Sequence, residues 1–133
     1  MNAESAFGAY ITTKNESAVT DATPHKLISL LLERVSESVA TASGAAKRGE
    51  SALAGEAIGK ALNILESLRA FLNHDEGGEI AANLDDLYDY MGRRLLEATS
   101  DRNPETFLEV SELLSQIRQG WDGIPGELRD ATQ

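Results

Sequence analysis

The sequence of 133 residues contains no cysteine, so it has neither a disulfide framework nor a thiolate metal site. It also lacks any run of about twenty apolar residues, which excludes a helix that spans a membrane. The start of the chain has neither the basic stretch nor the apolar run of a secretory signal. We therefore expect a soluble protein of the cytoplasm.

Basic residues are scarce. The chain has 12 lysines and arginines against 22 aspartates and glutamates, which gives a formal net charge of −10. Such a chain repels phosphate backbones and anionic membranes unless its cations cluster, and here they are dispersed. We therefore expect neither nucleic acid nor a membrane among the direct partners.

Recognisable catalytic and metal-binding motifs are missing as well. His25 and His74 both fall near expected helix ends, where a histidine is typically a solvated or capping group. There is no Glu-x-x-His pair of a di-iron bundle, no H-E-x-x-H, no P-loop and no nucleophile elbow. The aspartates within 85–89 lie beside Arg93 and Arg94, which favours a solvated helix face. We predict no enzyme, no metal and no cofactor.

The spacing of apolar residues predicts an all-α protein. No segment alternates in the manner of a β-strand, and the breaks between the helical patterns are short. Four helices with short connections favour an antiparallel, up-down-up-down four-helix bundle. The expected helices cover about residues 24–46, 51–73, 78–100 and 104–121.

Local signals mark the ends of these helices. Thr23 followed by proline, and Asn103 followed by proline, are typical helix starts. The glycine pair 77–78 predicts a turn, with Gly78 as the cap of the third helix. Gly55 and Gly59 predict fraying at the start of the second helix, because an interior glycine costs about 1 kcal/mol.

The N-terminal segment carries an apolar cluster outside the expected bundle. Phe7, Tyr10 and Ile11 have the spacing of one helical turn, but the segment is too short to be a stable helix alone. Two compatible interpretations follow, a flap that covers the edge of the core and a removable plug over a partner groove. The chain thus divides into a short N-terminal capping segment (flap or plug) at 1–22, a helical bundle at 23–121 and a flexible acidic tail at 122–133.

The first two helices are apolar over about half of their circumference, which is more than a bundle of this size needs. Either these helices are central in the packing, or part of their surface binds another chain, such as an amphipathic helix. The third helix has an apolar stripe that contains Ile80, Leu84, Leu87, Met91 and Leu95. The candidate partner-binding residues are Phe7, Tyr10, Ile11, Ile64, Leu68, Phe71, Ile80, Leu84, Tyr88 and Met91.

The run GGEIAANLDDLYDYMGRRLL at 77–96 resembles the signature of the flagellar secretion chaperone FliS family. Further similarity lies in ATPHKLI at 22–28, in KALNI at 60–64 and in the segment 109–121. The chain departs from the family at 31–34, where many members carry an aromatic and acidic-glycine segment, and this departure leaves the local packing there in doubt.

The resemblance implies a cytoplasmic export chaperone with the same helical bundle. Such a protein binds the disordered C-terminal segment of flagellin, prevents premature polymerisation and aids delivery to the flagellar type III export apparatus. Its N-terminal segment would occupy one groove and yield to the client. The implied partners are flagellin, an export-gate component and other flagellar regulators, with the chaperone as a monomer or weak dimer.

Two alternatives share the same bundle. One is a helical adaptor or regulatory protein that sequesters a different client. The other is an obligate homodimer in which the wide apolar faces pair with each other.

Overall fold

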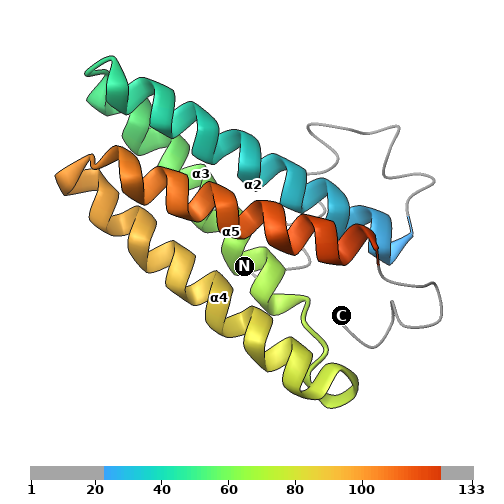
Figure 1. Cartoon of the computed structure of the whole chain (residues 1–133). Helices are drawn as coiled ribbons and strands as arrows, with labels where there is room; N and C mark the ends of the chain where they lie inside the picture. Colours follow the sequence, from blue (N-terminus) through green and yellow to red (C-terminus); the bar gives the residue numbers. More distant parts are fainter. Residues whose placement is uncertain (1–22, 124–133) are drawn as a thin grey trace.

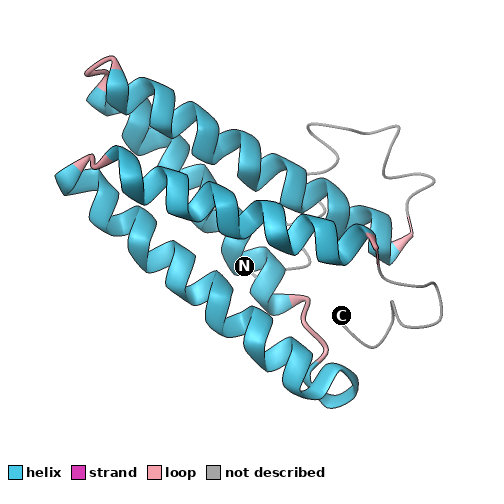
Figure 2. Cartoon of the chain, viewed as in Figure 1, coloured by secondary structure: helices cyan, strands magenta, loops and turns pink. Residues whose placement is uncertain are grey.

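The computed structural model describes residues 23–123, so the predicted N-terminal segment and nearly all of the predicted tail lie outside it. Within these residues the chain forms four helices and no strand, which confirms the all-α bundle (Figure 2). The helices are α2 at Pro24–Lys47, α3 at Ser51–Ala70, α4 at His74–Asp101 and α5 at Pro104–Asp122 (Figure 1).

Consecutive helices run in opposite directions and pack side by side (Figure 1). Helix α2 packs against α3 and α5, and α4 packs against the same two helices. The contact between α4 and α5 is the smallest of the four. Among residues 23–123, no helix is both long and apolar enough to cross a bilayer.

Side-chain caps fix two of the predicted helix starts. The Thr23 hydroxyl accepts a hydrogen bond from the backbone N–H of Lys26 at 3.1 Å. The Asn103 side-chain oxygen accepts one from the backbone N–H of Glu105 at 3.0 Å. Both bonds satisfy amides that have no partner within the helix. The local signals at Thr23 and Asn103 are therefore confirmed.

Helix α3 begins at Ser51 as predicted and ends earlier than predicted. Its N-cap is Glu50, whose side chain makes no capping hydrogen bond, and the helix ends at Ala70, three residues before the expected end at Asn73. It runs without a break through Gly55 and Gly59, so the predicted fraying is wrong. The burial of the apolar side of α3 outweighs the low helix propensity of these glycines.

A break at Gly78 separates the first turn of α4 from the rest. Gly78 has φ 50° and ψ −122°, a conformation that favours glycine over every residue with a Cβ atom. The predicted turn at the glycine pair is thus confirmed. Residues 74–77, expected as a plain connection, instead form a helical turn that the Asn73 side chain caps at Glu76 N.

The core runs along the axis of the bundle and draws on all four described helices. Trp121 is buried near the end of α5, where it closes one end of the core. The largest fully buried side chains of the core are Leu31, Leu32, Val35, Val39, Ile58, Leu68, Met91, Leu95, Phe107, Val110 and Leu114.

Candidate binding surface

The apolar stripe of α4 is buried along one half of the helix and open along the other. Met91 and Leu95 are both 0% exposed. Ile80 is 58% exposed, and Leu84 and Leu87 are half-buried. Their spacing puts all five residues on one side of the helix. The difference therefore comes from what neighbours α4 and not from the pattern within it.

Helix α5 contacts the buried half of α4 through polar groups as well as through the core. The Tyr90 hydroxyl donates to Glu109 Oε2 at 2.7 Å, and Arg94 Nε donates to Glu109 Oε1 at 2.8 Å. The hydrogen bond from Tyr90, and then that from Arg94, hold the pKa of Glu109 below its usual value. Among the described residues, no hydrogen bond or ion pair joins α5 to any part of α4 before Tyr90.

The open half of α4 is bound to α3 instead. Arg69 Nε donates to Asp85 Oδ1 at 2.7 Å, and Arg69 Nη1 lies 3.5 Å from Asp89 Oδ1. The hydrogen bond to Asp85 is the main reason that the pKa of Arg69 is raised. Within α4, Arg93 Nε also donates to Asp89 Oδ2 at 3.1 Å. Two of the aspartates on the presumed solvated face therefore link two helices, a link that the spacing along one helix does not show.

The last half of α5 is bound to α2, away from the open half of α4. The rings of His25 and Trp121 are stacked, with their centroids 4.7 Å apart and their planes 9° from parallel. His25 Nε2 donates to the backbone oxygen of Trp121 at 2.9 Å, and Trp121 Nε1 donates to the backbone oxygen of His25 at 3.1 Å. His25 was predicted to be solvated or capping, and it caps a carbonyl of another helix.

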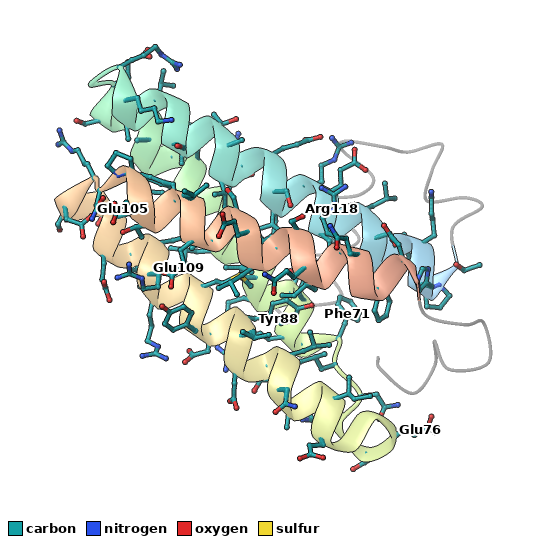
Figure 3. The ribbon with its side chains drawn as sticks, in the orientation of Figure 1. Phe71, Glu76, Tyr88, Glu105, Glu109 and Arg118 are labelled. Carbon is teal, nitrogen blue, oxygen red and sulfur yellow. The ribbon has the colours of Figure 1, made fainter. Side chains whose placement is uncertain are left out.

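These contacts explain why α4 and α5 diverge from the end where Glu109 joins them (Figure 1). Leu113 and Ile117, in the last half of α5, are half-buried like Leu84 and Leu87. The side chains of Phe71 and Tyr88 are drawn between the two ribbons (Figure 3). We use the term open apolar face for the set Ile80, Leu84, Leu87, Leu113 and Ile117.

The structure separates the predicted partner-binding residues into three groups. Ile80 is exposed, and Phe71 and Leu84 are half-buried at the surface. Three others, Phe7, Tyr10 and Ile11, lie outside the described residues. The remaining four are buried in the core: Ile64, Leu68, Tyr88 and Met91.

The four residues are thus core residues of the described bundle, and their part in partner binding stays a prediction. Tyr88 and Met91 lie on the part of the α4 stripe that neighbouring helices cover, and burial raises the pKa of the Tyr88 phenol. Sequence reasoning missed Leu113 and Ile117 as surface residues, and it placed Leu87 on the stripe without selecting it. The spacing of Leu87 from Ile80 was a usable signal, whereas nothing in the sequence shows where α5 leaves α4.

Comparisons with known proteins agree with this architecture. The family described as "Flagellar protein FliS" matches residues 6–127. Flagellar secretion chaperone FliSB of Pseudomonas aeruginosa is 44% identical over 93% of this chain and 98% of its own length. Flagellar secretion chaperone FliS of Salmonella typhimurium is 41% identical over 93% of each chain. The corresponding chaperone of Vibrio cholerae is 36% identical over 93% of this chain and 91% of its own.

These relatives carry the names of chaperones, and the family is not one of enzymes. The prediction that the protein is not an enzyme is therefore confirmed. The resemblance found in the 77–96 run is confirmed over nearly the whole chain. The chain belongs to the FliS family of flagellar secretion chaperones.

Proposed function

We propose that this protein binds the disordered C-terminal segment of flagellin in the cytoplasm, prevents its premature polymerisation and aids its delivery to the flagellar type III export apparatus. Membership of the FliS family supports the chaperone role. The observation that carries the binding site is the uncovered half of the α4 stripe, with Ile80 58% exposed. A large apolar residue at that exposure, in line with a half-buried apolar row, marks a surface for another chain.

The buried half of α4 suggests how a client would sit. There, Met91 and Leu95 are buried in the core, and the first half of α5 is bonded to α4 through Glu109. A client helix on the open apolar face would take the corresponding place beside Ile80, Leu84 and Leu87. An amphipathic helix with apolar residues at i, i+3 or i+4, and i+7 has the right pattern for this contact.

Binding of this kind has a thermodynamic requirement. A segment that is disordered when free must bury enough apolar area to offset the cost of ordering it. The open apolar face supplies part of that area on two helices at once. Association should therefore show a clearly negative heat-capacity change.

The N-terminal segment with Phe7, Tyr10 and Ile11 belongs to the same proposal as a removable plug, although it lies outside the described residues. A plug lowers the apparent affinity for a client by the cost of displacing it. An export-gate component and other flagellar regulators complete the proposed partners, with the chaperone acting as a monomer or weak dimer.

Titration calorimetry with a peptide from the flagellin C-terminus tests the proposal. Ile80→Asp puts a charge on the open apolar face, and we expect it to weaken binding at least tenfold, about 1.4 kcal/mol. Leu108→Asp is the matched control, because Leu108 on α5 is also 58% exposed but lies outside the face. We expect the control to bind as the wild type does, and both variants to keep the wild-type melting temperature.

Three results would contradict this function or its site. A wild-type chain that does not bind the peptide excludes flagellin as the client. Equal losses in the Ile80 and Leu108 variants place binding elsewhere. Light scattering that shows a tight dimer, with a monomer only in the Ile80 variant, favours the homodimer alternative.

A further inference from the structure

The contact between His25 and Trp121 ties two segments that lie 96 residues apart in the sequence. It combines stacked rings with two hydrogen bonds, each from the side chain of one residue to the backbone oxygen of the other. We call this arrangement the His25–Trp121 clasp. It joins the first turn of α2 to the last turn of α5.

The clasp supplies hydrogen-bond partners to two polar groups. The carbonyl of Trp121 lies in the last turn of α5, where the cap N–H of Gly123 is shared between this carbonyl and that of Gln119. The indole N–H of a buried tryptophan needs an acceptor, and the His25 carbonyl provides it. Ser29 adds a longer hydrogen bond to Asp122 at 3.4 Å. These contacts therefore fix the position of the end of α5 against α2.

The attachment of the end of α5 to α2 matters because a different position of α5 would cover the open apolar face. Met91 and Leu95 of the α4 stripe are in the core, at the level where Tyr90 and Arg94 join α4 to α5, and the same stripe continues through Leu84 and Ile80. A swing of the last half of α5 toward α4 would bury these residues and is favoured by the hydrophobic effect. Arg69 binds the opposite side of α4 to α3, so it does not prevent this swing.

We propose that His25 and Trp121 are positioning residues for the client surface, because their clasp holds the end of α5 on α2 and so keeps the open apolar face from closing. The consequence for binding rests on the proposed chaperone function. The position of α5 does not, and it can be measured without any client.

Spin labels can measure the opening directly, since the chain has no cysteine of its own. Labels at Asn83→Cys on α4 and Gln116→Cys on α5 report on the open end, and both sites are exposed. A pair at Ser100→Cys and Ser111→Cys reports on the end where α4 and α5 stay together. In His25→Ala we expect the first distance to shorten and the second to stay unchanged.

Peptide affinity in unlabelled protein is the second readout. We expect His25→Ala to weaken binding of the flagellin peptide by on the order of tenfold, as a smaller fraction of molecules keeps the face open. Val39→Ala is the control for general loss of stability, because Val39 is fully buried in the middle of α2 and outside the clasp. It should leave both the distance and the affinity unchanged. If His25→Ala does not fold, Trp121→Phe removes the indole donor, keeps a smaller aromatic ring and is measured in the same way.

The possible results separate the two proposals. An unchanged or longer distance in the clasp variants overturns the positioning role, as does an equal shortening in Val39→Ala. A shorter distance with wild-type affinity overturns the link between the clasp and binding. A shorter distance in a protein whose wild type does not bind the peptide overturns the flagellin proposal and supports the clasp.

Discussion

The two halves of α4 carry one apolar pattern and meet different surroundings. In the C-terminal half, the stripe belongs to the core, and Met91 and Leu95 have no exposed surface. In the N-terminal half, Ile80 is mostly exposed. The comparison shows that periodicity determines which side of a helix is apolar, whereas the paths of the neighbouring helices determine how much of that side is buried.

Polar contacts mark the point where the two halves separate. Tyr90 and Arg94 both reach Glu109, so α5 is held to α4 at this level. One turn earlier, Asp85 is bonded to Arg69 on α3. The C-terminal half of α4 is thus hydrogen-bonded to α5, and the N-terminal half is hydrogen-bonded to α3. The proposed client surface lies on the N-terminal half, where α5 makes no such bond within the described part of the chain.

The largest expected effect tests the contrast in burial. Leu95→Ala should lower the free energy of unfolding by about 2–5 kcal/mol, because it leaves a cavity in the core. Ile80→Ala removes a side chain of similar size from the open half and should change it by less than about 0.5 kcal/mol. Urea unfolding of the two variants beside the wild type measures both values. Similar losses in the two variants would mean that the open half is covered after all.

A smaller effect concerns the start of the open half. Gly78→Ala forces a Cβ atom into the backbone conformation at φ 50° and should cost about 1 kcal/mol or more. Gly55→Ala is its counterpart, since Gly55 is helical and an added Cβ atom meets nothing within 4 Å. It should stabilise the protein by about 0.5–1 kcal/mol. A neutral or stabilising Gly78→Ala would show that the break before the open half is not needed.

The smallest effect probes the junction between the halves. Tyr90→Phe removes the hydrogen bond that contributes most to the lowered pKa of Glu109, so that pKa should rise toward its ordinary value. A carboxyl with a lowered pKa stabilises the fold above its ordinary pKa, and this contribution is lost as the pH falls through the lowered value. Titration of the Glu109 carboxyl carbon by NMR measures the shift.

Tyr88→Phe serves as the control for that titration, because Tyr88 is buried and makes no hydrogen bond with Glu109. The pKa of Glu109 should keep its wild-type value in this variant. A Tyr90 variant with the same titration curve as the wild type would assign the lowered pKa to Arg94 alone.

Sequence reasoning succeeded where the cause is local. The caps at Thr23 and Asn103 and the break at Gly78 each depend on a few adjacent residues. The family could also be predicted from the sequence, because the 77–96 run is a long and specific motif.

It failed where the cause is the placement of a distant helix. Tyr88 and Met91 were assigned to a partner surface, yet the neighbouring helices bury them. The capping role of His25 was expected, but its partner Trp121, 96 residues away in the sequence, was not. Spacing along one helix carries no information on such contacts.

One further consequence follows from the clasp. Trp121 is the only tryptophan of the chain, and its indole lies against the His25 ring beside the end of α5. Tryptophan fluorescence of this protein therefore comes from one residue whose position is known. The protein carries its own optical probe, and the arrival of a ligand or a shift of α5 can be followed in real time without any dye.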